Sequence, residues 1–175
     1  MGIASALPLP SRISAMPGNP IRELWDRVGH LPGGRSLFTR AIGLAAPYTA
    51  TIGARVEVLS KGHAEVSLRD RRSVRNHLSC VHAVALVNLA ELAGNVAIAY
   101  SMPDDARFIV AGIDIRYLKK ARGTLRAVAD CPIPSSSQRQ EYQVPVRILD
   151  GADVEVARAS LTTLIGPKPR ARGRA

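Results

Sequence analysis

The chain has 175 residues, of which 46% are hydrophobic and 4% aromatic, and it carries a net charge of +10. This length and apolar content predict one globular domain with a sizeable core, and they exclude a chain that is disordered throughout. The positive charge favours a polyanionic ligand or surface, but the scarcity of aromatic residues argues against a nucleic-acid partner.

The chain begins with a segment, residues 1–19, that is rich in Pro and Ala and has no basic stretch followed by an apolar run. It is therefore predicted to be a flexible leader and not a signal peptide. Pro20 and the apolar spacing of residues 21–28 then predict a short helix, because proline favours the first helical position. Residues 36–44 predict a second short helix.

Two strands and a long helix follow. Residues 55–59 and 64–69 alternate apolar and polar side chains on either side of a Lys61-Gly62 turn, which predicts a pair of strands. From residue 81 to residue 100 the pattern changes to a helix that is apolar nearly all round, so it is expected to be buried on most sides. Three polar residues interrupt this stretch, and we therefore expect no membrane span.

Four further strands are predicted at residues 108–119, 124–130, 142–148 and 154–165, with a hairpin turn at Asp150-Gly151. In the first of them, five apolar residues are expected to share one face: Ile109, Ala111, Ile113, Ile115 and Tyr117. One long helix among antiparallel strands is typical of an α+β domain whose sheet wraps the helix, here over residues 20–167. Residues 168–175 are predicted to be a basic, disordered tail.

The chain has two cysteines, Cys80 and Cys131. Two are too few for a disulfide scaffold and show no metal-ligand spacing, so we expect a cytoplasmic protein without a metal site. Cys80 lies two residues before His82, but neighbouring positions rarely give the geometry of a nucleophile and its base. Cys80 is therefore predicted to be a small packing residue.

The long helix carries one charged residue among apolar neighbours, Glu91, which needs a partner or a function because burying an unpaired charge is costly. His82 lies nine positions earlier. At about 100° and 1.5 Å per residue, the two side chains point to opposite sides of the helix and lie roughly 13 Å apart along it. Two antiparallel helices in a twofold dimer bring His82 of one chain near Glu91 of the other, which predicts a site between subunits if both residues act together.

Each candidate also has a structural interpretation. Glu91 can pair with an arginine or with backbone donors in a dimer interface. His82 can cap the helix or pack against its neighbours, and Asn76, in the loop before the helix, can bond to its own backbone. These alternatives stay open for each residue taken alone.

The segment from Asn76 to Glu91 resembles a motif of the phenylacetate-type and menaquinone-type acyl-CoA thioesterases of the hotdog superfamily. Their pattern is a loop Asn or Gln, then His-Gly-Gly six residues later at a helix start, then an acidic residue nine after the His; here these positions are Asn76, His82 and Glu91. Together with Tyr-Leu-Lys-Lys-Ala-Arg-Gly at residues 117–123, the segment is similar to an uncharacterised bacterial branch of that superfamily. The resemblance covers about residues 45–165.

The resemblance implies a hotdog fold, a homodimer or homotetramer, and hydrolysis of an acyl-CoA or other acyl thioester, with coenzyme A as part of the substrate and no separate cofactor. Glu91 would activate water or attack the thioester carbonyl, and the Ala83 N–H would hold the oxyanion. Asn76 would orient water or the carbonyl, His82 would position the thioester, and Asn95 could touch the same group. Unless they only solvate a strand end, basic and hydroxyl residues would bind coenzyme A: Lys119, Lys120, Arg122, Ser137 and Arg139.

The chain departs from this pattern where His-Gly-Gly becomes His82-Ala83-Val84. Ala83 keeps the N–H that the oxyanion needs, whereas Val84 is bulkier than glycine and can narrow the acyl slot. Two other functions stay open: a hotdog protein that binds acyl-CoA or a lipid-like ligand without turnover, and a basic accessory protein whose tail meets nucleic acid or a membrane. A hotdog dehydratase is not favoured, because its Gly-Pro-rich His loop is missing.

Overall fold

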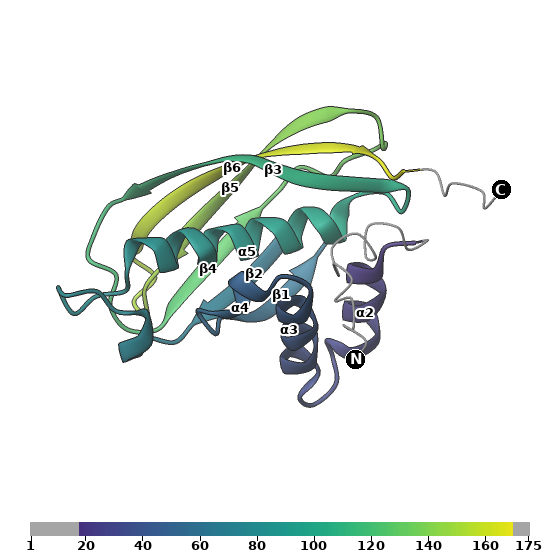
Figure 1. Cartoon of the computed structure of the whole chain (residues 1–175). Coiled ribbons are helices and arrows are strands. Elements are labelled where there is room, and N and C mark those ends of the chain that lie inside the picture. The colour runs from purple at the N-terminus through teal and green to yellow at the C-terminus, as the bar shows by residue number, and fades with distance from the viewer. Residues whose placement is uncertain (1–17, 170–175) are drawn as a thin grey trace, which may run out of the picture.

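A curved antiparallel sheet wraps one long helix in the computed structural model of the chain, which describes residues 18–169 (Figure 1). The sheet has the strand order β1-β2-β4-β5-β6-β3. Its members are β1 (Arg55–Ser60), β2 (His63–Leu68), β3 (Ala106–Tyr117), β4 (Leu125–Asp130), β5 (Gln140–Leu149) and β6 (Glu155–Pro167). All pairings are antiparallel, so the predicted α+β domain with a wrapped helix is confirmed.

The long helix, α5, spans Ala83–Ser101 and lies against the sheet as the main core element. Three shorter helices precede β1, namely α2 (Pro20–Val28), α3 (Gly34–Ala45) and α4 (Pro47–Ala50), and a 3-10 turn follows β2 at Arg72–Val74. Both predicted N-terminal helices are confirmed, while α4 and the 3-10 turn are too short to give a periodic signal. The predicted leader and tail lie outside the described residues, except for Gly18, Asn19, Lys168 and Pro169.

A glycine sets the distance between α5 and the sheet. A Cβ at Gly94 would lie 2.7 Å from Leu161 Cδ2 on β6 and 3.3 Å from Val144 Cγ1 on β5. Both neighbours are fully buried, so neither can move aside easily. Glycine therefore allows α5 to pack closely on β5 and β6, which positions the functional residues of α5 relative to the sheet.

The predicted face of β3 is wrong over its first half. A register shift between Val110 and Gly112 marks a β-bulge, and an extra residue in one strand reverses which side chains face the core. Before the bulge, Phe108 and Val110 pack on the core while Ile109 is 66% exposed. After it, the odd-numbered Ile113 packs on the core, as predicted.

By length and composition alone, α5 meets the requirement for a membrane span, although polar residues interrupt its sequence. In the structure, 67% of that apolar segment is buried inside the protein. The less buried residues of α5 are Ala83 and Tyr100 near its ends and, between them, a stripe with helical spacing: Val84, Val87, Glu91 and Asn95. The apolar character of α5 is therefore that of a core helix with one uncovered side.

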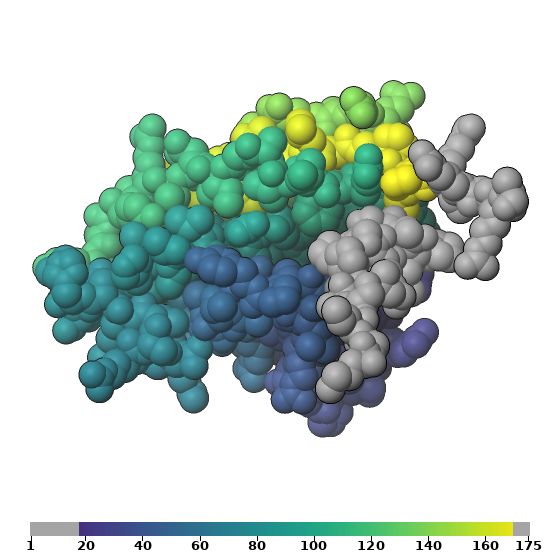
Figure 2. Space-filling model, in the orientation of Figure 1, coloured from purple at the N-terminus to yellow at the C-terminus, as the bar shows by residue number. Residues whose placement is uncertain are grey.

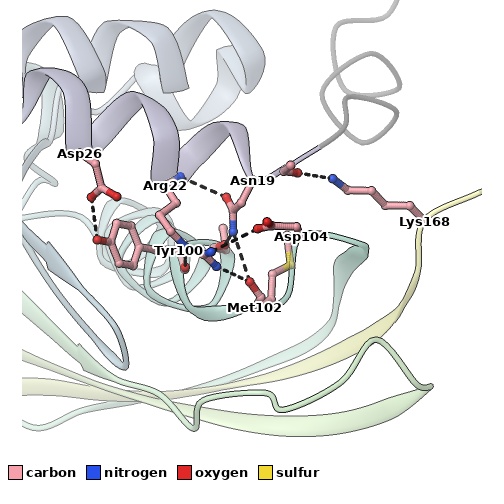
Figure 3. A network of polar contacts seen from close by, with 9 residues as sticks. Asn19, Arg22, Asp26, Tyr100, Met102, Asp104 and Lys168 are labelled. Carbon is pink, nitrogen blue, oxygen red and sulfur yellow. Dashed lines mark hydrogen bonds and ion pairs between the residues drawn. The ribbon is translucent and has the colours of Figure 1, made fainter.

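Helix α2 is fixed to the end of α5 by hydrogen bonds to carbonyl groups (Figure 3). The Asn19 side chain accepts from Arg22 N at 3.1 Å, capping α2, and its Nδ2 donates to Ala99 O at 2.7 Å. Arg22 donates from Nε to Tyr100 O at 2.9 Å and from Nη2 to Met102 O at 2.5 Å. These donors satisfy carbonyls that a helix C-terminus leaves unpaired, so α2 is held firmly against α5.

Candidate functional site

The helix α5 begins with a capping histidine. His82 has an extended backbone (φ −64°, ψ 140°), and its Nδ1 accepts a hydrogen bond from Val84 N at 3.1 Å. Its own N–H donates to Val74 O at 2.8 Å. An imidazole nitrogen that accepts carries no proton, so this cap places a ring hydrogen on Nε2. His82 therefore fills the capping role that the sequence left open.

The first N–H of α5 has no acceptor among residues 18–169. The neighbouring N–H of Val84 is capped by His82, whereas Ala83 itself lines a hollow of about 330 Å³. Asn76, Tyr117 and Lys119 line the same hollow. Because the N-terminus of a helix carries partial positive charge, this hollow suits a developing negative charge.

Asn76 organises the loop that leads into α5. Its Oδ1 accepts from Leu78 N at 2.9 Å, and its own N–H donates to Cys80 O at 2.9 Å. Ser79, where the thioesterase pattern commonly has glycine, adopts a left-handed backbone with φ 53°. The side-chain carbonyl of Asn76 thus forms a hydrogen bond within its own loop, while its side-chain Nδ2 has no partner among the described residues. The buried Cys80 packs here, with Sγ 3.3 Å from Asn76 Oδ1.

Glu91 lies half-buried in the middle of α5, on its less buried stripe. Within residues 18–169 no hydrogen bond or ion pair holds its carboxylate. One turn further on, Asn95 Oδ1 is buried and also lacks a hydrogen-bond partner in the described part of the chain. Glu91 and Asn95 are thus neighbouring polar groups on the less buried stripe of a core helix that have no partner in the described part of the chain.

Sequence reasoning did not single out Asn88, which is 4% exposed on the adjacent side of α5. Its Nδ2 donates to Tyr48 O at 3.2 Å, and its Oδ1 has no partner among residues 18–169. Asn88 and His82 line a second hollow, of about 230 Å³, beneath α4. In the space-filling view, the blue helical segment before β1 and the teal segment at the start of α5 lie side by side on one face (Figure 2). The sequence could have identified Asn88 because it is a polar residue within a helix that was expected to be buried on most sides.

The predicted catalytic residues do not meet within one chain. His82 and Glu91 are separated by most of the first half of α5, about 13 Å along its axis. Asn76 and Ala83 share one hollow, His82 lines another, and Glu91 lines neither. A site that uses all of these residues requires a second chain, and it stays a prediction.

The residues predicted to bind coenzyme A fall into two groups. Lys119 and Lys120 line the hollow at Ala83, and Arg122 follows at the adjoining turn. At the other end of the sheet, Ser137 Oγ donates to Asp105 Oδ2 at 2.6 Å, and Arg139 lies beside Gly166.

The separation of the two groups follows from strand pairing. Tyr117, just before the two lysines, pairs with Ala157 of β6, whereas Gln140, just after Arg139, pairs with Ile165. Eight residues of β6 separate these pairs, a distance of roughly 26 Å. One chain therefore does not bring the two groups together, and the lysine group alone adjoins the helix start.

An acidic side chain ties together the loops around the hollow at Ala83. Asp70 accepts from Arg75 Nε at 2.6 Å and from Gly123 N at 2.9 Å, and its side chain is 9% exposed. The hydrogen bond from Arg75 holds the pKa of Asp70 below its ordinary value, and the Gly123 N–H acts in the same direction. In the described part of the chain, no group of three or more His, Cys, Asp or Glu residues is placed to hold a metal ion.

The protein has a hotdog fold of the kind found in thioesterase-family proteins. A structural-genomics protein, APC5556, superposes with a TM-score of 0.73 at 34% identity, over 84% of this chain and 98% of its own. PA5026 from Pseudomonas aeruginosa, described as a probable thioesterase, gives a TM-score of 0.65 at 23% identity over 78% and 97%. A thioesterase family protein from Silicibacter pomeroyi gives 0.63 at 18% identity over 73% and 95%.

The chain belongs to a family of hotdog type, the domain of unknown function DUF4442, whose profile matches residues 34–165. This match contains the whole sheet except its last two residues, together with α3, α4 and α5. Helix α2 precedes it. No curated protein sequence matches the chain.

Proposed function

We propose that this protein hydrolyses an acyl thioester, such as an acyl-CoA, at a site formed between the α5 helices of two subunits. The observation that carries the proposal is the half-buried Glu91 carboxylate, which has no partner within residues 18–169 on the one uncovered stripe of a core helix. Several proteins of the same fold are named thioesterases, which supports this class of reaction.

In the proposed reaction, Glu91 of one subunit removes a proton from water, whose oxygen bonds to the thioester carbonyl carbon; the C–S bond then breaks, and the thiolate leaves and takes up the proton. If Glu91 attacks the carbonyl itself, the same C–S bond breaks, the thiolate takes a proton from water, and a second water hydrolyses the resulting anhydride to release the acid and restore Glu91. The N–H of Ala83 of the partner subunit donates to the carbonyl oxygen and stabilises the negative charge that develops there. The free Nδ2 of Asn76 orients the carbonyl or the water in the same hollow. His82 keeps the Ala83 N–H directed outward, since it caps the neighbouring N–H of Val84.

Coenzyme A is the carrier that the charges around this hollow favour. Lys119 and Lys120 line the hollow together with Ala83, and ammonium groups are suited to bind phosphates. Ser137 and Arg139 act in this proposal only if a second subunit brings the far end of its sheet to the same ligand. The attacking group and the phosphate contacts then belong to different chains.

The test of this proposal is Glu91→Gln, which removes the charge and keeps the shape of the side chain. We expect hydrolysis of a panel of acyl-CoA esters to fall at least about a hundredfold, the usual contribution of a general base, while acyl-CoA binding measured by calorimetry persists. Glu141→Gln, the same exchange on an exposed residue of β5, is the control and should retain activity.

Two outcomes would contradict the proposal. If wild-type protein binds acyl-CoA esters but hydrolyses none of them, the protein is a binding module. If Glu91→Gln retains the wild-type rate, Glu91 is a structural residue and the hydrolytic group lies elsewhere.

A further inference from the structure

A largely apolar cavity lies beside the proposed site. It measures about 260 Å³ and is enclosed by α2, the corner between α3 and α4, the C-terminal half of α5 and the start of β3. Large apolar side chains from four elements line it: Ile21, Ile42, Leu92, Val96, Met102 and Phe108. A mainly apolar lining with a small number of polar groups is typical of a site for a small-molecule ligand, and here the polar or charged lining residues are Asn19, Thr49, Asn95, Arg107 and Lys168.

The walls of this cavity are held in place before any ligand arrives. Helix α2, which forms one side, is fixed by the hydrogen bonds of Asn19 and Arg22 to the end of α5 (Figure 3). A further bond joins Tyr100 Oη to Asp26 Oδ1 at 2.7 Å. Because α2 cannot collapse onto α5 without breaking these bonds, the space between them is a property of the fold.

The cavity has one polar group directed at it from α5. Asn95 lines it, and its buried Oδ1 has no hydrogen-bond partner among residues 18–169. Asn95 follows Glu91 by one helical turn, which places the two side chains about 5–6 Å apart at Cβ. The end of the cavity at Asn95 is therefore next to the proposed catalytic carboxylate, and the cavity runs from there towards Met102, where Asn19, Arg107 and Lys168 also line it.

We propose that this cavity receives the acyl chain of the thioester and selects for a linear, medium-length aliphatic chain. This inference rests on the proposed function and names its substrate class. The thioester end meets Glu91 and Asn95, and the chain extends along α5 beneath α2. Asn95 is a positioning residue in this arrangement, because its open acceptor binds the water at this end of the cavity.

The size of the cavity sets the chain length. At about 260 Å³ the cavity is small beside the roughly 300–1,000 Å³ of typical ligand pockets. A medium-length chain such as octanoyl therefore suits it, whereas an acetyl group leaves most of it empty and a palmitoyl chain is too long. Val84, which replaces a glycine of the thioesterase pattern, lines the smaller hollow at His82 and not this cavity.

The test is a substitution that fills the cavity from the side formed by α3. Ala45 is a small, half-buried lining residue, so Ala45→Trp occupies the space. Leu44→Trp, at the neighbouring position, is 65% exposed before substitution and is the matched control. We measure kcat/KM for acetyl-, octanoyl- and palmitoyl-CoA. Calorimetry measures the binding of 1-octanol, which has an apolar chain and a hydroxyl donor and reports on the cavity without turnover.

Wild-type protein should prefer octanoyl-CoA, and Ala45→Trp should lower the octanoyl-to-acetyl ratio of kcat/KM by about tenfold or more and abolish octanol binding. Leu44→Trp should change neither. Phe108→Ala, which enlarges the cavity, should shift the preference towards palmitoyl-CoA, and it decides the question if Ala45→Trp fails to fold.

Unchanged ratios and unchanged octanol binding in both cavity variants would overturn the inference while leaving the hydrolase intact. If no ester is hydrolysed but octanol binds wild type and not Ala45→Trp, the proposed hydrolysis fails and the cavity remains a site for an aliphatic chain. The two failures are thus distinguishable.

Discussion

Asp70 is the residue that connects the loop before α5 to the turn after Lys120. Its two hydrogen bonds, to Arg75 and to Gly123 N, cross between segments that are far apart in the sequence. The resulting low pKa means that the folded state favours the charged form of this carboxyl more than the unfolded state does. Its contribution to stability is therefore present above the unfolded pKa of about 3.9 and is lost as the pH falls towards the lower folded value.

We predict that Asp70→Asn lowers the melting temperature at pH 7 by about 2–4 °C and that the difference from wild type shrinks below about pH 4. Thermal unfolding followed by circular dichroism across this range measures both effects. Asp114→Asn, an exposed carboxylate on β3 without a partner in the described part of the chain, is the control and should show neither effect. A difference that stays constant down to low pH would contradict the assigned role of the charge.

The motif spacing identified Asn76 and His82 but not what their polar atoms bind. Asn76 turns its carbonyl to Leu78 N, and His82 turns Nδ1 to Val84 N, because the backbone there is bent in a way that residue types alone do not reveal. The left-handed φ of Ser79 is part of that bend. The sequence offered a helix cap for His82 and a local backbone bond for Asn76 as alternatives, but it could not choose between these and a catalytic role, because hydrogen-bond partners in a loop depend on such torsion angles.

At the scale of elements, the distance between α5 and the sheet depends on Gly94. An alanine would favour the isolated helix by about 1 kcal/mol, since glycine is a poor helix former. In the folded protein its Cβ would collide with the fully buried Leu161, and overpacking of a core typically costs about 1–3 kcal/mol. The packing cost exceeds the gain in propensity.

We therefore predict that Gly94→Ala lowers the free energy of unfolding by up to about 2 kcal/mol, measured by urea denaturation. Gly151→Ala is the control, because a Cβ at that turn position meets nothing within 4 Å. An increase in stability for Gly94→Ala would show that α5 can move away from β6 without loss.

Element boundaries were predictable where the pattern is long and regular. The limits of β5 and β6, and of α5 itself, lie within about two residues of those expected from periodicity. The face of β3 was not predictable, since a single extra residue at the bulge reverses the alternation and leaves apolar residues such as Ile109 exposed. The bulge arises from the pairing of β3 with β6. The alternation of residues within β3 alone carries no information about that pairing.

At the scale of the whole molecule, the least buried stripe of α5 is its most informative surface. Val84, at the start of the stripe, is 52% exposed, and Glu91 and Asn95 further along lack partners in residues 18–169. A helix that is otherwise buried on all sides does not leave such a stripe in water without a reason. A second copy of α5 running antiparallel over the stripe is the cover that the proposed site requires.

This arrangement predicts complementation between two inactive variants. Glu91→Gln removes the carboxylate, and Ala83→Pro removes the oxyanion donor while keeping the helix, because proline suits the first helical position and His82 already has the extended backbone that precedes proline. Each variant alone should be inactive. Refolded together, they should regain roughly a quarter of wild-type activity, since half of random dimers are mixed and each mixed dimer holds one intact site.

When the two variants carry different tags, purification through both tags isolates the mixed dimers. Their activity is then measured directly. The control mixes Glu91→Gln with itself under two tags and should stay inactive. If the two groups act within one chain, every site in the mixed dimer lacks one of them, and no activity returns. Restored activity therefore requires that Glu91 and the Ala83 N–H meet across the subunit boundary, because within one helix these two groups lie about 12 Å apart along the axis.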